Sequence, residues 1–249
     1  MGIETYAGRV ALVTGASSGI GAAITQALLR HGLTVVGLAR RVDRVKALAL
    51  KDAPGKLHAI KGDVADESSI VAAFKWIKEN LSGVDILINN AGLGIDSDLT
   101  SGKTEDWKRI LDVNVLGLSI CTREAVQDML SRGVDDGFII HISSLLGHVQ
   151  PSNSAIAMYT ASKHAVKTLL EGLRKDLVAK KSKIRVGEVS PGAVKTEFIS
   201  NFKGVPPNIY DMIPCLESED VAEAVLYMLS QHPRVQVHDV LIYPTGSPQ

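Results

Sequence analysis

The chain has 249 residues, 45% of them hydrophobic and 22% charged, a composition typical of a soluble globular protein. Lys and Arg together number 27, as do Asp and Glu, so no net charge attracts nucleic acid or an anionic membrane. The two cysteines, Cys121 and Cys215, are too few for a disulfide framework and too far apart for closely spaced zinc ligands. We therefore expect one domain over residues 1–249, with reduced cysteines, no metal and no nucleic-acid partner.

The amino-terminal segment and the apolar runs bear on location. No basic segment followed by a long apolar core opens the chain, and no apolar run approaches the roughly 18 residues of a membrane span. Tyr6 occupies the position where an N-myristoylation signal requires Ser or Thr. These features predict a cytoplasmic protein without a membrane span.

Short β-branched runs alternate along the chain with longer segments of helical period. The predicted strands span residues 10–14, 34–38, 57–60, 86–88, 138–142, 184–189 and 240–243. The predicted helices span residues 20–31, 42–51, 67–81, 104–132, 157–180 and 218–231, with Asp66, Thr104 and Ser218 as N-caps. Strands such as those at 10–14 and 138–142 are apolar on both faces, which is typical of strands covered by helices on each side. The pattern predicts an α/β fold with a doubly wound, seven-stranded parallel sheet and helices on both faces.

The least regular stretch runs from about residue 197 to residue 216. It contains Pro206, Pro207 and Pro214 together with scattered large apolar side chains. Irregular segments on a rigid scaffold often carry binding residues. We expect this stretch to be a substrate loop or lid.

A glycine-rich turn directly follows the first predicted strand. Residues 14–21 read Thr-Gly-Ala-Ser-Ser-Gly-Ile-Gly and lead into a helical segment. Glycines let backbone N–H groups approach an anion, and a helix N-terminus adds positive partial charge. A structural tight turn is the alternative, but the position after the first strand of a parallel sheet favours dinucleotide binding. The predicted contacts are Gly15, Ser17, Ser18, Gly19, Ile20 and Gly21.

The end of the second predicted strand indicates which dinucleotide binds. NAD-binding folds usually place an Asp or Glu there to bind the ribose 2′-hydroxyl, and Ala39 stands at that position. Arg40 and Arg41 follow, and a guanidinium group suits a phosphate. The sequence predicts NADP(H) as the cofactor, with Arg40 as the better phosphate ligand. The alternative is an exposed arginine pair that serves solubility.

A Tyr and a Lys four residues apart point to acid/base chemistry. Tyr159 and Lys163 project from one face of a predicted helix, about one turn apart. We expect the ammonium group and an oxidised nicotinamide to lower the pKa of the phenol, which then serves as general acid or base. Ser144 supplies a hydroxyl at a strand end, and Asn114 is an unfavoured residue inside a predicted helix. Together these residues predict a catalytic site.

As a set, the motifs resemble the short-chain dehydrogenase/reductase family over nearly the whole chain. They are TGASSGIG at 14–21, Asp63 with Val64, NNAG at 89–92, Asn114, Ser144, YTASK at 159–163 and PGAVKT at 191–196. The sequence segments LARR, INNAGL and PGAVKTEF most resemble those of the branch of insect farnesol dehydrogenases and member-11 dehydrogenase/reductases. The resemblance implies a single Rossmann-fold domain that works as an NADP-dependent alcohol dehydrogenase or carbonyl reductase.

The resemblance also implies a role for each motif residue. Tyr159 is the proton donor or acceptor, and Lys163 lowers its pKa and binds the nicotinamide ribose. Ser144 orients the substrate oxygen, with Ser143 as the adjacent alternative, and Asn114 holds a water of the proton relay. The remaining implied cofactor contacts are Asp63 and Val64 at adenine, Asn90, Ala91 and Gly92 at the central ribose region, Val194 and Thr196 at the nicotinamide carboxamide, and the neighbouring Pro191 and Gly192.

The segments expected to face the substrate carry few groups that pair with charge. Their apolar residues are Leu93, Leu145, Leu146, Val149, Ile156, Phe198, Ile199, Phe202, Ile209, Tyr210, Met212 and Ile213. This composition favours a small-molecule substrate that is a medium or long hydrophobic alcohol or ketone, although lid packing or an oligomer contact explains the same pattern. The resemblance to the farnesol dehydrogenase branch implies a farnesol-like isoprenoid alcohol or a steroid-like carbonyl compound. We expect His141 and His148 to be hydrogen-bonded structural residues.

Two further expectations concern assembly and the alternative function. The predicted helix at 157–180 has apolar residues on more than one face, which, with the resemblance, predicts a homodimer or homotetramer. A dinucleotide-binding sensor or scaffold without turnover is the alternative to an enzyme. The complete set of Asn114, Ser144, Tyr159 and Lys163 favours the enzyme, because a sensor has no need of it.

Overall fold

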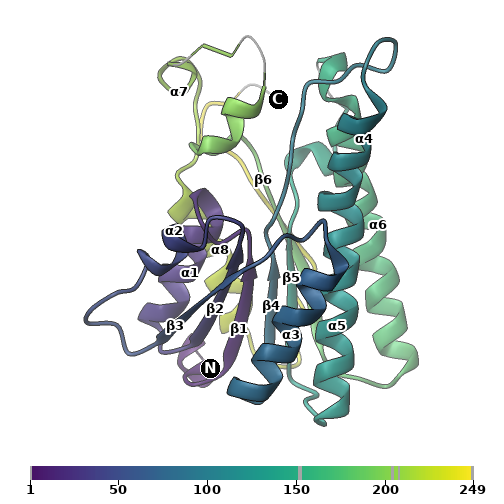
Figure 1. The fold of residues 1–249 in the computed structure, drawn as a ribbon. Helices are drawn as coiled ribbons and strands as arrows, with labels where there is room; N and C mark the ends of the chain where they lie inside the picture. The colour runs from purple at the N-terminus through teal and green to yellow at the C-terminus, as the bar shows by residue number, and fades with distance from the viewer. Residues whose placement is uncertain (1, 151–152, 203–204, 207, 248–249) are drawn as a thin grey trace.

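The strands form one parallel sheet with helices on both faces (Figure 1). The structure is a computed structural model and describes residues 2–150, 153–202, 205–206 and 208–247. The strands are β1 (Val10–Thr14), β2 (Thr34–Ala39), β3 (Lys56–Lys61), β4 (Ile86–Asn89), β5 (Phe138–Ile142), β6 (Arg185–Pro191) and β7 (Asp239–Ile242). They lie in the order β3-β2-β1-β4-β5-β6-β7, and every adjacent pair is parallel. The predicted doubly wound sheet is therefore confirmed.

The helices alternate with the strands along the chain. They are α1 (Gly19–Arg30), α2 (Val42–Lys46), α3 (Glu67–Leu81), α4 (Thr104–Leu111), α5 (Leu118–Ser131), α6 (Ala157–Ala179), α7 (Ile209–Met212) and α8 (Ser218–Ser230). Short 3-10 turns add η1 (Ile3–Tyr6), η3 (Leu145–Gly147), η4 (Ser154–Ile156) and η5 (Glu197–Asn201). In the part of the chain that the structure describes, no helix has the length and apolar character needed to cross a membrane.

The helix predicted over 104–132 is interrupted by a π-helix, η2 (Asp112–Gly117), between α4 and α5. At Gly117 an added Cβ would lie 2.4 Å from the carbonyl oxygen of Val64, so the backbone approaches the end of the β3 segment closely there. The wider turn permits this approach. Residue periodicity does not distinguish such a turn from an ordinary α-helix.

Three other predicted helix features have mixed outcomes. Asp66 is the N-cap of α3, where its carboxylate accepts a hydrogen bond from the Ser68 N–H. Thr104 and Ser218 are the first helical residues rather than caps, and Glu217 caps α8 through a reciprocal capping box with Asp220. The helix predicted over 42–51 ends at residue 46. The following backbone hydrogen bonds, from Leu48 to Val45 and from Ala49 to Lys46, span three residues, as in a 3-10 turn.

Alternation within the central strands supplies both layers of the core. In β1, Val13 packs with α1 and α8 on one face, while Leu12 packs with α3, α5 and α6 on the other. Both side chains are fully buried, as expected for a strand covered on each side. Because all strands are parallel, their carboxyl ends meet at one edge of the sheet, and the segment that carries η5 and α7 lies above this edge (Figure 1).

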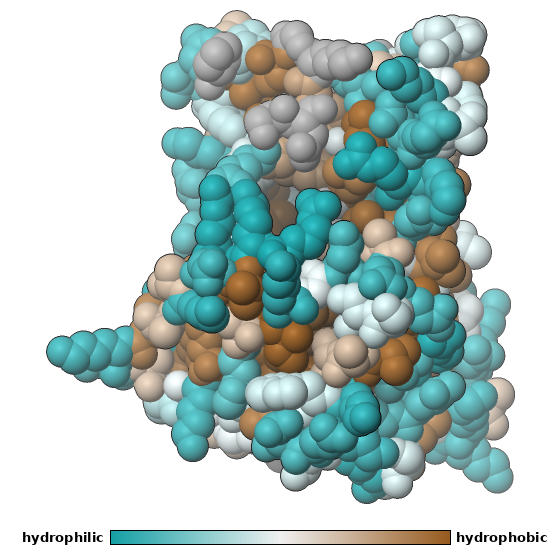
Figure 2. Space-filling model, viewed as in Figure 1, coloured by the Kyte–Doolittle hydropathy of each residue, from teal (hydrophilic) through white to brown (hydrophobic). Residues whose placement is uncertain are grey.

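The same edge of the molecule is hollowed on the face shown in Figure 2. Apolar surface gathers in the hollow below the segment that carries α7, and hydrophilic side chains surround it. The two ends of the segment are joined by an isolated backbone bridge between Val194 and Leu216. The two ends of the irregular loop predicted over 197–216 therefore lie side by side, at the Val194–Leu216 bridge.

A row of buried polar side chains crosses the sheet in register. Asn89, His141, Glu188 and Asp239 are direct partners on β4, β5, β6 and β7. The Asn89 amide lies 3.2 Å from the His141 ring, so His141 is hydrogen-bonded in the core as expected. Burial lowers the pKa of His141 to about 3, which keeps its ring neutral.

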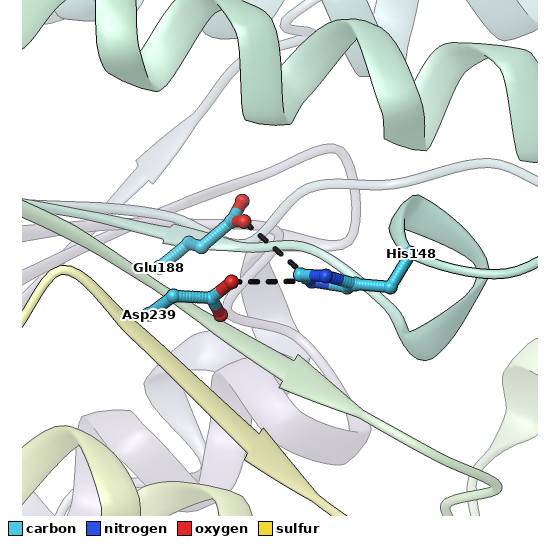
Figure 3. A group of neighbouring side chains, drawn as sticks. All are labelled: His148, Glu188 and Asp239. Atoms are coloured by element: carbon cyan, nitrogen blue, oxygen red, sulfur yellow. Dashed lines mark ion pairs between the residues drawn. The ribbon is translucent and has the colours of Figure 1, made fainter.

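At the outer end of this row, His148 joins the acidic side chains (Figure 3). Its Nε2 atom lies 3.3 Å from Asp239 Oδ2, 3.8 Å from Glu188 Oε1 and 3.0 Å from Ser190 Oγ. Lys167 Nζ donates to Nδ1 over 2.8 Å, and because an ammonium group only donates, the ring proton must sit on Nε2. A metal ion on Nε2 would require the opposite arrangement, with an Nδ1–H that donates to an acceptor. The contacts of His148 therefore fit a ring that carries its proton on Nε2 and points it at the acidic side chains, rather than a metal ligand.

Glu188 is the unusual member of this cluster. Its side chain is 0% exposed, and neither carboxylate oxygen has a hydrogen-bond partner among the described residues. Burial, reinforced by the negative charge of Asp239, raises the pKa of Glu188 to about 7. The carboxyl group is therefore partly protonated and partly ionised near neutral pH.

This shift predicts a pH-dependent stability. Because the pKa of Glu188 is raised from an ordinary value near 4.5, the folded chain binds its proton more tightly, and stability falls as pH rises from about 4.5 to about 7. Glu188→Gln mimics the protonated acid. We expect its melting temperature to equal that of the unmodified chain at pH 5 and to exceed it by about 3–8 °C at pH 8.

The exposed Glu223→Gln provides the control, since it removes one carboxylate from the surface of α8. Its melting temperature should follow the unmodified chain at both pH values. A Glu188→Gln profile parallel to that of the unmodified chain would show that the carboxyl group does not titrate in this range.

Candidate active site

The glycine turn between β1 and α1 forms a cradle that larger residues would block. Gly15 and Gly19 have φ values of +66° and +53°, a region that favours glycine. At Gly21 an added Cβ would lie 2.4 Å from the Asn90 amide and 2.5 Å from the Gly15 carbonyl oxygen. The turn therefore runs against the end of β4 with its backbone open to the edge of the sheet.

Hydrogen bonds hold the loop after β4 against the end of β1. The Thr14 hydroxyl accepts from the N–H groups of Asn90 and Ala91, each over 3.0 Å. The Asn90 side chain donates back to the carbonyls of Thr14, at 2.9 Å, and Gly15, at 3.2 Å. Sequence reasoning named Asn90 and Ala91 but missed the role of Thr14, which its place at a strand end could have indicated.

The end of β2 carries three arginines that differ in their contacts. Arg41 donates to Ser18 Oγ of the glycine turn over 2.8 Å and to Glu197 over 2.9 Å. Arg44, which sequence reasoning missed, donates to the same carboxylate over 2.7 Å. Arg40 is 73% exposed and faces Asp63 at 3.9 Å. The geometry thus joins Arg41 rather than Arg40 to the glycine turn.

Tyr159, Lys163 and Ser144 meet where β5 ends. Lys163 Nζ donates to the carbonyl of Ile142 over 2.9 Å and lies 5.7 Å from the centre of the Tyr159 ring. The Ser144 hydroxyl forms a hydrogen bond with the phenol. Tyr159 is 8% and Lys163 5% exposed. Three of the residues predicted to be catalytic, Tyr159, Lys163 and Ser144, therefore lie together. Of the two neighbouring serines, Ser144 bonds the phenol and Ser143 is buried.

Burial dominates the electrostatics of this group. It raises the pKa of Tyr159 to about 12, against the smaller lowering effect of the bond from Ser144. This is the pKa of the phenol without a bound ligand; that Lys163 and an oxidised nicotinamide together lower it stays a prediction. Burial also lowers the pKa of Lys163 to about 8, and the negative charge of Glu188 opposes that shift. Lys163 remains mostly charged at neutral pH.

Asn114 connects the π-helix to the active site. Its side chain accepts from the Leu93 N–H over 2.7 Å and donates to the Leu93 carbonyl and to Ser162 Oγ, each over 2.9 Å. Ser162 in turn donates to the carbonyl of Tyr159. These bonds hold the Asn114 side chain in place, and the expectation that Asn114 holds a water of the proton relay stays a prediction.

Two aromatic rings cover the Tyr159 phenol. Phe198 and Phe202 lie 5.5 Å and 6.4 Å from the Tyr159 ring, centre to centre, and 5.4 Å from each other. Both were expected to face substrate, and both come from the segment after β6. Met212 and Val149, by contrast, are 63% and 42% exposed. The apolar cover therefore comes from only part of the predicted set.

A backbone clamp holds the start of this segment. The Tyr210 hydroxyl accepts from the Thr196 N–H over 3.1 Å and donates to the Thr196 carbonyl over 2.8 Å. Thr196 also approaches the glycine turn, since a Cβ at Gly19 would lie 2.8 Å from its Cγ2 atom. The clamp was missed at the sequence level, where Tyr210 counted only as an apolar side chain.

The other predicted cofactor residues lie on the same edge of the sheet, at strand ends or in the loops that follow them. Pro191 ends β6, and Gly192 donates its N–H to the carbonyl of Ile242. Val64 is 9% exposed and packs below the π-helix, while the N–H of Asp63 donates to Ser69 Oγ. Also on this edge are Ser17, Ile20, Gly92 and Val194, each half-buried or exposed.

Comparisons with known proteins agree with this geometry. The short chain dehydrogenase family model matches residues 9–204. The chain is 47% identical over 251 residues to dehydrogenase/reductase SDR family member 11 of Gallus gallus, with 98% of each chain covered. It is 46% identical over 249 residues to the farnesol dehydrogenase of Aedes aegypti, covering 98% of this chain and 99% of the relative.

A solved structure shares the fold. The alcohol dehydrogenase of the archaeon Thermococcus sibiricus, complexed with 5-hydroxy-NADP, superimposes with a TM-score of 0.82 at 26% identity, over 97% of this chain and 98% of its own. The resemblance seen in the sequence motifs is thus confirmed by matches that span almost the full chain. On these grounds the chain belongs to the short-chain dehydrogenase/reductase family of oxidoreductases.

Proposed function

We propose that this enzyme transfers hydride between NADP(H) and the carbinol or carbonyl carbon of a hydrophobic alcohol, ketone or aldehyde. The observation that carries the proposal is the buried group of Tyr159, Ser144 and Lys163 beneath an apolar cover. Bound nicotinamide supplies the hydride acceptor or donor and, when oxidised, a positive charge. The chain supplies the proton transfer and the orientation of the substrate oxygen.

The residues at the glycine turn and at the end of β2 support NADP(H). The turn with Gly15, Gly19 and Gly21 leads into the N-terminus of α1, where backbone N–H groups and the helix dipole favour a pyrophosphate. At the end of β2, two guanidinium groups already bind a carboxylate, which shows that this position suits an anion. The Thermococcus relative holds an NADP derivative.

Within this site, Tyr159 gives its proton to a carbonyl oxygen or takes one from an alcohol. Ser144 donates a hydrogen bond that orients the same oxygen. Lys163 places a positive charge near the phenol and favours its ionised form once a second positive charge is close. The raised pKa in the ligand-free chain keeps the phenol protonated until then.

The cover over the phenol supports an apolar substrate. Phe198 and Phe202 offer ring faces and edges but no charge, and both rings pack directly against Gly94, where an added Cβ would lie 2.4 Å from Phe202 Cζ and 2.8 Å from Phe198 Cζ. We propose a farnesol-like isoprenoid or a steroid-like carbonyl compound, in line with the name of the Aedes relative.

We also propose a homodimer or homotetramer that works in the cytoplasm. Leu111, Leu116 and Leu169 are 40%, 54% and 37% exposed on α4, the π-helix and α6. These helices form one layer on the side of the sheet away from α1 and α8 (Figure 1). An apolar strip on such a layer is typical of a subunit contact.

Replacing the phenol tests the proposed chemistry. Tyr159→Phe removes the proton donor while keeping the ring, so we expect turnover of farnesol or of a carbonyl substrate to fall by about 10²–10⁴-fold. NADPH binding, followed by its fluorescence, should change little. Tyr227→Phe, at an exposed position on α8, is the matched control and should keep full turnover. Retained activity in Tyr159→Phe would remove the phenol from the mechanism.

The arginines at the end of β2 test the cofactor. We expect Arg41→Ala to raise the KM for NADPH about tenfold or more and to change the KM for NADH far less, since a charge-assisted contact is lost only with the 2′-phosphate. Arg40→Ala should have the smaller effect, because Arg40 makes no contact with the glycine turn. Arg30→Ala, at the exposed end of α1, is the control. Equal effects on both cofactors would exclude Arg41 from the phosphate site.

A further inference from the structure

Glu197 is bound in the position where the proposed cofactor needs its phosphate ligands. One carboxylate oxygen accepts from Arg41 over 2.9 Å and the other accepts from Arg44 over 2.7 Å. Arg41 also donates to Ser18 Oγ at the start of α1, over 2.8 Å. We call the two ion pairs to Glu197 the arginine–Glu197 bridge. It joins residues 156 and 153 positions apart in the chain.

The position of the bridge matters because it lies at the end of β2, beside the glycine turn. In this fold the ribose 2′ substituent of a dinucleotide reaches the end of the second strand. A 2′-phosphate there presents the same kind of acceptor oxygens to the same guanidinium groups. A carboxylate and a phosphate repel each other, so both cannot occupy the two arginines together.

Glu197 is also the first residue of η5, which covers the catalytic site. The next residue, Phe198, packs on the Tyr159 ring at 5.5 Å. The preceding residue, Thr196, is clamped by Tyr210 and lies against Gly19. Release of the Glu197 carboxylate therefore acts on η5, a short turn that is held at its start through Thr196 and that covers the Tyr159 phenol with Phe198.

From these contacts we infer that Glu197 competes with the cofactor 2′-phosphate for Arg41 and Arg44, and that its release frees η5 above Tyr159. The inference rests on the proposed use of NADP(H). Glu197 is then a specificity-determining and positioning residue. NAD(H), which has no 2′-phosphate, leaves the arginine–Glu197 bridge closed.

The side chains of the bridge are exposed enough for exchange. Arg41, Arg44 and Glu197 are 47%, 50% and 54% exposed, so solvent screens both ion pairs. Pairs of this kind contribute little stability, and a more highly charged anion displaces them readily. The two arginines hold the pKa of Glu197 below its usual value, so the carboxylate is ionised throughout the working range of the enzyme.

Binding of cofactor fragments tests the competition without turnover. Adenosine 2′,5′-bisphosphate carries the 2′-phosphate, and ADP lacks it. Calorimetric titration at low salt should show that Glu197→Gln binds the bisphosphate about three- to tenfold more tightly than the unmodified chain. Its affinity for ADP should stay within about twofold. Glu219→Gln removes an exposed carboxylate from the first turn of α8 and should leave both affinities unchanged.

The release of η5 has its own readout. In the unmodified chain, the bisphosphate should raise amide hydrogen exchange in residues 197–202, while ADP should not. In Glu197→Gln, exchange there should already be high without ligand, and the bisphosphate should add little.

The outcomes separate the two proposals. If the unmodified chain binds the bisphosphate no better than ADP, the NADP(H) proposal fails and the competition fails with it. If it prefers the bisphosphate but Glu197→Gln binds it with unchanged affinity, NADP(H) stands and the competition is overturned. Exchange in residues 197–202 that ignores the bisphosphate would overturn the release of η5.

Discussion

The site depends on one buried positive charge. Lys163 is almost fully enclosed, and its ammonium group donates to the carbonyl of Ile142, where β5 ends. This contact fixes α6 against the strand end and so fixes the distance between the phenol on the helix and Ser144, which follows two residues after Ile142. Burying a charge is costly unless partners compensate for it. The carbonyl and the carboxyl group of Glu188 provide that compensation.

Glu188 belongs to the polar row that crosses the sheet beneath the site. A parallel sheet covered on both faces normally carries apolar side chains, yet β4 to β7 devote one register position each to a polar residue. The row leads from the amide of Asn89 to the half-buried cluster around His148, where solvent and Lys167 are close. His148 ends the turn that begins at Ser144, so the same cluster also holds the turn that carries this serine.

The sequence predicted the fold better than the electrostatics of the site. Strands buried on both faces and helices of clear period left little freedom, and all seven strands appear within two residues of their predicted ends. The π-helix was not predictable, because residue periodicity does not distinguish it from an α-helix, and its Gly117 lies close to Val64 in a contact between distant segments. The raised pKa of Tyr159 in the chain without a ligand was not predictable either. The sequence shows Lys163 one turn away, whereas the burial of the phenol depends on how distant segments pack around it.

The segment above the sheet begins and ends at one backbone bridge between Val194 and Leu216, and the Tyr210 hydroxyl also binds main-chain atoms of Thr196. These contacts close the segment at its base, while Phe198 and Phe202 reach from it to the Tyr159 ring. A loop closed at its base in this way tolerates changes in its outer part while the side chains beneath it keep their positions.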